Sequence, residues 1–246
     1  MTLLNIVKES RWLFFVVKRR AERKISGFRR LLRQPCEPKN ADGRVMIHLG
    51  CGDVVADGYI NVDLKPAPHV HYIHDVTNLP FFEDSFADLV YACHVIEHFP
   101  FERLKEILWE WRRILKNDGV LRLSIPDFDK LLILYRDSKN DVESIRLPLM
   151  GSDDGYYSHL LLFNFDFIKK ILNDNGFKNV RIWVPDQSSD HRFEDWASRG
   201  LIMGKLTYPI SLNVEAEKSA QYKNQTNTRE KGQPTTLIKE TTVVTI

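Results

Sequence analysis

Short apolar runs alternate with stretches of helical periodicity along the middle of this chain of 246 residues. The runs predict β-strands at residues 45–49, 70–74, 86–92, 120–125, 179–184 and 210–216, and one more that ends at Asp63. Apolar residues at helical spacing predict one helix from about Phe101 to a C-cap at Gly119 and another over residues 165–175. Strands that alternate with helices indicate an α/β fold, in which a mostly parallel sheet carries helices on both faces.

The remaining segments have weaker patterns. Residues 35–43 predict a linker, residues 128–160 a short helix with an irregular stretch, and residues 186–207 a long polar loop. Residues 218–246 are rich in Lys, Gln, Asn and Thr and have few apolar side chains, which predicts a disordered tail. We therefore expect one folded domain over residues 44–217.

Positive charge is concentrated at the N-terminus. Residues 1–34 hold ten Lys or Arg and two acidic residues, a net charge of +8, so within a whole chain of +2 the rest carries −6. One interpretation of this arm is a basic amphipathic helix that lies on an anionic membrane surface or on a membrane-bound partner. The other is a helix that packs on the domain and keeps its arginines in solvent. The acidic remainder argues against a nucleic-acid partner.

The composition is that of a soluble globular protein. The three cysteines, Cys36, Cys51 and Cys93, have neither the spacing of a disulfide framework nor that of zinc ligands. No apolar run is long enough to span a bilayer, and the arm lacks the cleavage site of a signal peptide. We expect a cytoplasmic protein, with peripheral contact at the inner face of the membrane left open by the basic arm.

Residues 44–64 (RVMIHLGCGDVVADGYINVDL) hold the most informative local pattern. A strand runs into a turn with Gly50 and Gly52, and the next strand ends on Asp63. Glycines let the backbone approach a ligand closely, and an acid at a strand end can accept both hydroxyls of a ribose. The dinucleotide fingerprint needs a third glycine where this chain has Val55, and an acid about 20 residues later. The shorter connection here leaves hardly any room for a crossover helix, which disfavours nicotinamide dinucleotides.

Candidate ligand-binding residues follow each of the first four predicted strands. The glycine turn follows the first strand, Asp63 ends the second, Asp75 follows the third, and residues 94–98 (HVIEH) follow the fourth. The carboxyl ends of parallel strands meet at one edge of a sheet, where ligands bind. The pattern therefore predicts a single binding crevice.

The segments HLGCG, INVDL, HDVTNLPF, SFADLVYACHVIEHF and WRRILKNDGVLRLSIPD, in this order, resemble the class I S-adenosylmethionine-dependent methyltransferases. The chain is most similar to their small, stand-alone bacterial type (methyltransferase-11-like), in which the fourth strand leads into a His-x-x-Glu-His run. The resemblance covers roughly residues 44–185. It implies a Rossmann-like, seven-stranded, mostly parallel sheet with helices on both faces, S-adenosylmethionine as the cofactor, and methyl transfer as the activity.

The resemblance also implies roles for individual residues. Gly50 and Gly52 would let the backbone approach the methionine part of the cofactor. Asp63 would hold the ribose hydroxyls. Asp75 would accept a hydrogen bond from the adenine amino group, with the Val76 amide near the ring. Asp75 also has a purely structural interpretation, as an acid that begins a turn.

The histidines after the fourth strand are candidates for proton transfer. The resemblance implies that His94 lies beside the sulfonium and the entering nucleophile. Because histidine titrates near neutral pH, we predict that His94 or His98 removes a proton from an acceptor hydroxyl. Glu97 and His159 are further candidates. Alternatively, Glu97 and His98 only cap the following helix and organise its loop.

A metal centre is a second interpretation of the same residues. His94, Glu97 and His98 stand at i, i+3 and i+4, which on a helix would place them on one face. Together with His159 they could ligate a divalent metal. Small-RNA 2′-O-methyltransferases have a similar run that begins with Glu instead of a histidine. Our main prediction contains no metal ligand.

The acceptor is constrained mainly by motifs that the sequence lacks. The motif [Asn/Asp/Ser]-Pro-Pro-[Tyr/Phe] of many base amino-methyltransferases is replaced by YACH, and Cys93 lacks the preceding proline expected of a cytosine-C5 nucleophile. We expect O-methylation of a small hydroxylated acceptor, such as a sugar, a glycan precursor or a lipid-linked intermediate. Its binding residues are expected in residues 128–160 and 186–207. A metal-assisted RNA 2′-O-methyltransferase is the alternative.

Two departures from the family pattern lie near the glycine turn. The family commonly has an acid where this chain has His48, and it usually has a longer helix between the turn and the second strand. These departures support a further alternative, a non-catalytic binding module on the same fold.

Overall fold

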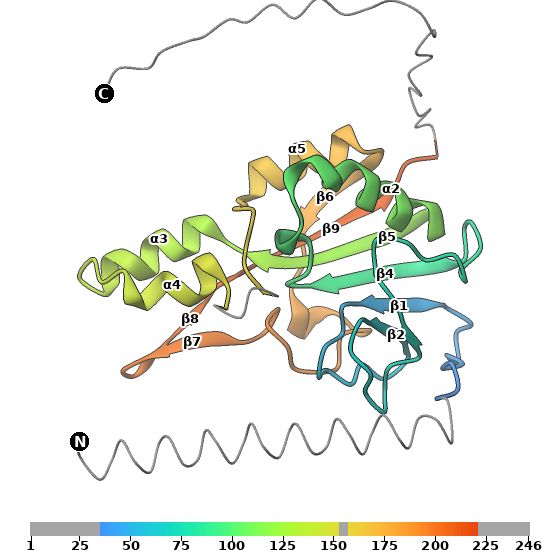
Figure 1. The fold of residues 1–246 in the computed structure, drawn as a ribbon, viewed down its shortest axis with the longest axis horizontal. Coiled ribbons are helices and arrows are strands. Elements are labelled where there is room, and N and C mark those ends of the chain that lie inside the picture. The colour runs from blue at the N-terminus through green and yellow to red at the C-terminus, as the bar shows by residue number, and fades with distance from the viewer. Residues whose placement is uncertain (1–34, 153–156, 221–246) are drawn as a thin grey trace, which may run out of the picture.

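The structure is a computed structural model that describes residues 35–152 and 157–220. A seven-stranded sheet with the order β3-β2-β1-β4-β5-β9-β6 lies at its centre (Figure 1). Its strands are β1 (Met46–Leu49), β2 (Tyr59–Asp63), β3 (Tyr72–Ile73), β4 (Ala87–Cys93), β5 (Leu115–Pro126), β6 (Phe177–Ile182) and β9 (Ser211–Lys218). Strands β1 to β5 pair in parallel, and β9 is antiparallel to β5 and β6. The predicted fold class, a mostly parallel Rossmann-like sheet with helices, is confirmed.

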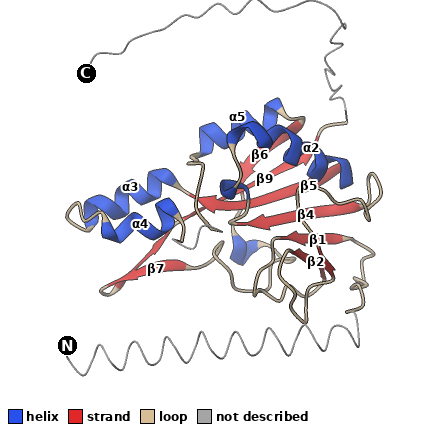
Figure 2. Ribbon diagram, viewed as in Figure 1, coloured by secondary structure: helices blue, strands red, loops and turns tan. Residues whose placement is uncertain are grey.

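The helices of the described residues are shown in blue in Figure 2 and lie between strands in the chain order. The α-helices are α2 (Leu104–Ile114), α3 (Phe128–Asp137), α4 (Glu143–Met150) and α5 (Phe165–Asp174). Three short 3₁₀ helices are η1 (Ile96–His98), η2 (Phe101–Arg103) and η3 (Pro185–Gln187). A separate hairpin consists of β7 (Gly200–Met203) and β8 (Leu206–Pro209).

Helices α2 and α5 lie side by side over one face of the sheet (Figure 1). Each is amphipathic, and its apolar side chains, among them Trp111 and Ile114 of α2 and Ile168 and Leu172 of α5, are buried in the main core. The indole Nε1–H of Trp111 donates to the carbonyl of Val76, 2.8 Å away. Helix α2 therefore both covers the sheet and holds the loop that follows β3.

The opposite face is covered by residues 183–197, which include η3 but no longer helix. Tyr59 and Tyr91 of the sheet pack there against Trp183 and Phe193. Residues 50–58, between β1 and β2, form no helix, as their short length predicts. Helices of the described part of the chain are thus unequally distributed over the two faces, because the segment after β6 fills the place of a crossover helix.

A buried charged group ties this covering segment to the sheet. Arg122 of β5 forms ion pairs of 3.1 Å with Asp190 and 3.0 Å with Glu215, and its guanidinium lies 4.6 Å from the centroid of the Trp183 ring. The guanidinium lowers the pKa of the Asp190 carboxyl against the opposing effect of burial. Because burying charges is costly, we expect these ion pairs of Arg122 to fix the position of the covering segment on the sheet more than they add to the free energy of unfolding.

The predicted end of the helix after β4 was wrong. Helix α2 ends at Ile114, and Leu115 is already extended and pairs with Ala87 of β4. The left-handed residue of the following turn is Asp118, with φ of 57°, rather than Gly119. A Cβ on Gly119 would lie 2.9 Å from the carbonyl oxygen of Lys116. The glycine is therefore explained by tight packing inside a turn, not by helix capping.

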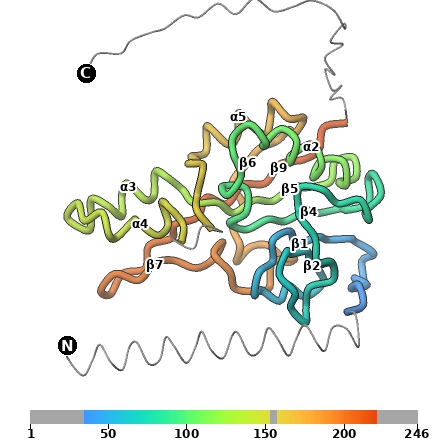
Figure 3. The backbone as a smooth tube through the Cα atoms, in the orientation of Figure 1, coloured from blue at the N-terminus to red at the C-terminus, as the bar shows by residue number. Residues whose placement is uncertain are grey.

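Two segments contain more regular structure than predicted. Residues 128–160 hold the helices α3 and α4 instead of one short helix, and α4 continues through Pro148. Residues 186–207 contain β7 and the start of β8, which meet at a turn with Gly204 at φ of 62°. The tube in Figure 3 shows these elements side by side beyond the carboxyl end of β5. Their apolar side chains form a small cluster.

The ends of the chain contain the remaining predictions. The arm of residues 1–34 and the tail beyond residue 220 lie outside the described residues. Strand β9 extends to Lys218, so regular structure reaches one residue past the predicted domain end. The predicted linker at residues 35–43 has no helix or strand, and Asn40 holds it by donating to the carbonyls of Arg44 and Gly58. No helix within residues 35–152 and 157–220 is long and apolar enough to cross a membrane.

Replacing Trp111 by alanine should lower the free energy of unfolding by about 3–5 kcal/mol, because it leaves a large cavity and an unpaired carbonyl at Val76. Trp109→Ala on the same helix is the matched control, since that side chain is 47% exposed and should change stability by less than about 0.5 kcal/mol. Urea unfolding measures both values. Equal losses in the two variants would contradict this packing.

Candidate active site

The turn after β1 brings the backbone to the edge of a cavity. Gly50 has φ of 64°, and a Cβ added to it would lie 2.5 Å from a methyl carbon of Val95. Gly52 has φ of 55°, and no atom lies within 4 Å of the place where its Cβ would be. Gly50 is therefore required by packing and backbone conformation, whereas Gly52 leaves the backbone open at the edge of the cavity.

The carboxylate of Asp63 is oriented by two backbone amides. Its Oδ2 accepts from the N–H of Gly52 at 2.8 Å, and its Oδ1 accepts from the N–H of Lys65 at 2.7 Å. Each carboxylate oxygen has a further lone pair. Both can thus accept from a pair of vicinal hydroxyls without rearrangement of the strand end.

Asp75 and Val76 follow β3 at the same edge. The Asp75 side chain is exposed, and its Oδ1 accepts from the N–H of Thr77 at 2.9 Å, so Asp75 does begin a turn. Its carboxylate also lines the cavity that contains Asp63. The structural and the ligand-binding interpretations of Asp75 are therefore compatible. Val76 is buried, and its carbonyl is held by Trp111.

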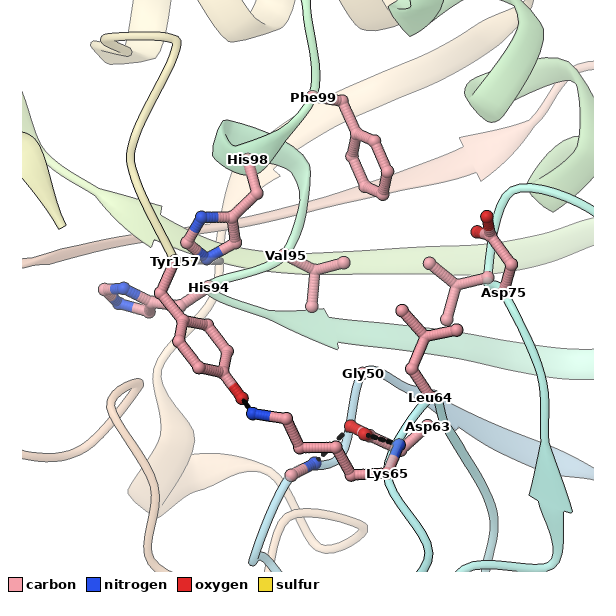
Figure 4. A pocket seen from close by; sticks show the side chains of 12 residues that line it. Gly50, Asp63, Leu64, Lys65, Asp75, His94, Val95, His98, Phe99 and Tyr157 are labelled. Carbon is pink, nitrogen blue, oxygen red and sulfur yellow. Dashed lines mark hydrogen bonds between the residues drawn. The ribbon is translucent and has the colours of Figure 1, made fainter. Parts of the chain in front are cut away.

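These residues surround one cavity of about 240 Å³, here called the donor pocket (Figure 4). Its lining includes every predicted site residue: Gly50, Gly52, Asp63, Asp75, Val76, His94 and His98. Leu64, Lys65, Val95, Phe99 and Tyr157 complete it. The Lys65 ammonium reaches across the pocket to the Tyr157 hydroxyl (Figure 4). The predicted residues share one cavity, although their individual roles stay predictions.

A second cavity of about 530 Å³, here called the acceptor cavity, adjoins the donor pocket. The two share the lining residues Gly50, Gly52, His94, His98 and Tyr157. The rest of the acceptor cavity is lined mainly by two parts of the chain. Residues 147–152 and 157–159 contribute Leu147, Pro148 and His159, and residues 195–201 contribute Asp195, Trp196 and Arg199. Both segments lie within the ranges in which the sequence analysis expects acceptor-binding residues.

His94 lies where the two cavities meet, in an unusual backbone conformation with φ of 53°. A residue other than glycine in this region costs about 1 kcal/mol or more, and such residues cluster at functional sites. Its Nε2 lies 2.8 Å from the hydroxyl of Ser211, which itself donates to the carbonyl of Trp196 at 2.6 Å. Because that hydroxyl proton is already used, His94 donates from Nε2, and in the neutral ring Nδ1 has the lone pair.

Glu97 faces His94 from the next turn. Its Oε1 lies 3.3 Å from His94 Nδ1 and 4.0 Å from His159 Nε2. The side chain is completely buried, and neither carboxylate oxygen accepts a hydrogen bond of good geometry from the described residues. Burial raises the pKa of Glu97 to about 8 and lowers that of His94 to about 3, with the neighbouring His159 and His98 adding to the second shift.

His98 has a different arrangement. Its Nδ1 lies 3.1 Å from the carbonyl of Ser158. A carbonyl oxygen can only accept, so Nδ1 is the protonated atom and Nε2 has the lone pair of the neutral ring. His98 lines both cavities and is partly exposed. Of the two predicted catalytic histidines, His98 therefore has the nitrogen that is available to a ligand.

His48, the departure at the end of β1, is buried among Tyr59, Tyr91 and Phe193. Burial lowers its pKa to about 4, so the ring is neutral at neutral pH. It also borders the acceptor cavity. Where the family commonly has an acid, this chain therefore has an uncharged ring at the boundary of the acceptor cavity. His48 does not line the donor pocket.

The sequence analysis did not identify several residues that line the donor pocket and the acceptor cavity. Lys65 and Tyr157 of the donor pocket, and Asp195, Trp196 and Arg199 of the acceptor cavity, stand in segments without periodicity. The only available signal was the concentration of polar and aromatic residues in residues 186–207. That signal identifies a segment but no individual side chain.

Comparison with known proteins agrees with this geometry. Residues 57–123 match the family model described as a methyltransferase domain. The matched part contains Asp63, Asp75 and residues 94–98, and it runs from the turn before β2 into β5. No curated protein sequence matches the chain.

Similar solved structures are also methyltransferases. An S-adenosylmethionine-dependent methyltransferase from Methanosarcina mazei has 15% identity and a TM-score of 0.45, and the match covers 77% of this chain and 96% of that one. One from Archaeoglobus fulgidus has 19% identity, a TM-score of 0.45 and coverages of 84% and 99%. Magnesium protoporphyrin IX methyltransferase from Synechocystis PCC 6803, with bound SAH, has 15% identity, a TM-score of 0.39 and coverages of 72% and 74%.

The family match, together with a seven-stranded sheet in which the antiparallel β9 lies between β5 and β6, defines a class of enzyme. The match over residues 57–123 and the fold around it indicate a class I S-adenosylmethionine-dependent methyltransferase, with S-adenosylmethionine as the methyl donor. The donor pocket fits this ligand, with an oriented carboxylate at Asp63 and an open backbone at Gly52.

Asp63→Ala should weaken binding of S-adenosylmethionine and S-adenosylhomocysteine by about 100-fold, since hydrogen bonds to a charged acceptor are worth about 1.5–3 kcal/mol each. Calorimetric titration measures this change. Asp57→Ala is the control, because Asp57 is exposed in the same connection and lines neither described cavity. Wild-type affinity in Asp63→Ala would contradict the assignment of this pocket.

Proposed function

We propose that this methyltransferase transfers the methyl group to a hydroxyl oxygen of a small acceptor, such as a sugar, a glycan precursor or a lipid-linked intermediate. The observation that supports this is the acceptor cavity of about 530 Å³, which shares His94, His98 and Tyr157 with the donor pocket. An acceptor bound there lies next to the end of the donor pocket formed by Gly50 and His94.

The lining of the acceptor cavity suits a hydroxylated ring. Trp196 offers a partly exposed aromatic face and Arg199 a donor of hydrogen bonds, while the carboxylate of Asp195 in the same lining is almost fully buried. Asp195 already accepts from the hydroxyl of Tyr91 at 2.5 Å, which fixes its position. Apolar faces flanked by a few oriented polar groups are typical of small-molecule sites.

S-adenosylmethionine supplies a methyl group that is already activated by its sulfonium, so the protein mainly contributes alignment and removal of a proton. Gly50 and Gly52 allow the backbone to approach the donor, and Asp63 fixes its ribose. His98 donates its Nδ1–H to Ser158 and presents Nε2 to the cavity, where it accepts the proton of the acceptor hydroxyl. His94 keeps Nε2 on Ser211 and positions the junction between the cavities.

The two alternatives have less support. A non-catalytic module would explain the departure at His48, but the donor pocket stays open beside it and contains both predicted acids. An RNA acceptor would need a basic surface, whereas the chain outside residues 1–34 carries a net charge of −6.

The acceptor class is tested with S-adenosylmethionine labelled in its methyl group. Methyl glycosides and nucleotide sugars should become labelled in a base-stable ether linkage, while hydroxyl-free amines, carboxylic acids and a short RNA should not. Labelling of the RNA or of amines alone would contradict O-methylation of a small hydroxylated acceptor.

His98→Ala should lower kcat by about 10²–10⁴-fold, the usual contribution of a general base, with the affinity for S-adenosylmethionine changed by less than about threefold. Single-turnover rates and calorimetry measure the two quantities. His74→Ala is the matched control, since this histidine lines neither described cavity. A His98→Ala enzyme with wild-type kcat would show that the acceptor needs no base here.

A further inference from the structure

Three ligating side chains from two distant parts of the sequence come together at the wall of the acceptor cavity. The turn after β4 and the helix η1 bring His94 and Glu97 onto the same side, and the chain after α4 brings His159 opposite them. One donor atom from each residue lies within 4.8 Å of the other two. Glu97 Oε1 is 3.3 Å from His94 Nδ1 and 4.0 Å from His159 Nε2.

Both imidazoles are held in the tautomer that a cation requires. His94 donates from Nε2 to Ser211, and its Nδ1 faces Glu97. His159 lies with Nδ1 3.0 Å from the carbonyl of Pro148, which can only accept, so its Nε2 has the lone pair and also faces Glu97. Metal-ligating histidines usually donate their other N–H to a carbonyl or an oxygen of this kind.

Glu97 completes the group as a fully buried carboxylate. Within residues 35–152 and 157–220, neither of its oxygens accepts a hydrogen bond of good geometry, and only the nearby backbone amides of Val95 and Glu97 offset part of the effect of burial on its pKa. Buried polar groups are almost always paired, and an unpaired carboxylate is among the costliest to bury. The lone pairs of two oriented histidines converge on this same carboxylate. A bound cation would satisfy all three groups together.

We propose that His94, Glu97 and His159 form a binding site for a divalent transition-metal ion. Two imidazole nitrogens and one carboxylate favour Zn²⁺, Mn²⁺, Fe²⁺ or Co²⁺ over Mg²⁺ and Ca²⁺, which prefer oxygen ligands. Ligands bound at about 2.0–2.2 Å are separated by roughly 3.3–3.6 Å in a tetrahedral site. The His94–Glu97 distance of 3.3 Å already fits, whereas His159, 4.0 Å from Glu97 in a group that spans up to 4.8 Å, would move toward the other two ligands. The main sequence-based prediction contains no metal ligand, and its metal-binding alternative also included His98, which stands outside this group.

The site is placed to act on the acceptor. His94 and His159 line the acceptor cavity, whereas Glu97 lies behind them. Open coordination positions would therefore face the cavity, where a metal lowers the pKa of a bound hydroxyl. Metal binding itself does not depend on the proposed O-methylation, and only this catalytic role rests on it.

The test uses the full-length protein, stripped of metal with a chelator and titrated with Co²⁺. One equivalent per chain should bind and give the visible absorption of a four- or five-coordinate ion, and Zn²⁺ should displace it. Glu97→Gln keeps the buried shape and should weaken binding by at least about 100-fold. His159→Gln should do the same from the wall of the acceptor cavity, where the side chain is less deeply buried than Glu97, which covers the case in which the Glu97 variant does not fold.

His98→Gln separates this claim from the proposed function. His98 stands outside the three-residue group, so its variant should bind Co²⁺ as the wild type does even where its kcat falls. Absence of stoichiometric Co²⁺ or Zn²⁺ in the wild type would overturn the proposal and leave a proton shared between Glu97 and His94 as the occupant. Unchanged Co²⁺ affinity in folded Glu97→Gln and His159→Gln would overturn it as well.

Discussion

The contact between Gly50 and Val95 fixes the position of the donor pocket relative to the acceptor cavity. No side chain fits at Gly50, because its Cβ would approach a Val95 methyl to 2.5 Å. Val95 stands between His94 and Glu97 in the sequence. The contact that positions the glycine turn therefore also positions these two polar residues after β4. The donor pocket and the acceptor cavity consequently meet at a fixed place, which is what in-line transfer between two bound molecules requires.

The departures from the family pattern are physically connected. A short connection between β1 and β2 leaves one face of the sheet without a crossover helix, and residues 183–197 cover it instead. Arg122 anchors that segment through Asp190. The chain then continues through Asp195 and Trp196 into the wall of the acceptor cavity. His48, neutral and buried, fits this aromatic face as a charged acid would not.

Much of the fold, and the set of residues that line the donor pocket together, follow from the sequence, whereas the lining of the acceptor cavity does not. Strands and the glycine turn depend on local periodicity and on backbone sterics, which a sequence displays directly. Pro148 and Gly151 concealed helix α4, since proline and glycine ordinarily interrupt a helix. The tautomers of His94 and His159 depend on Ser211 and Pro148, and only the folded chain brings these residues together. Such contacts over long sequence separations leave no local pattern.

A crystal structure of the full-length protein with S-adenosylhomocysteine tests the central claim most directly, namely that the two cavities are the donor and acceptor halves of one active site. The account predicts the ribose on Asp63, the adenine beside Asp75 and Val76, and the sulfur at the junction near Gly50 and His94, facing the acceptor cavity. A ligand bound elsewhere, or bound with its sulfur turned away from His94 and His98, would contradict it.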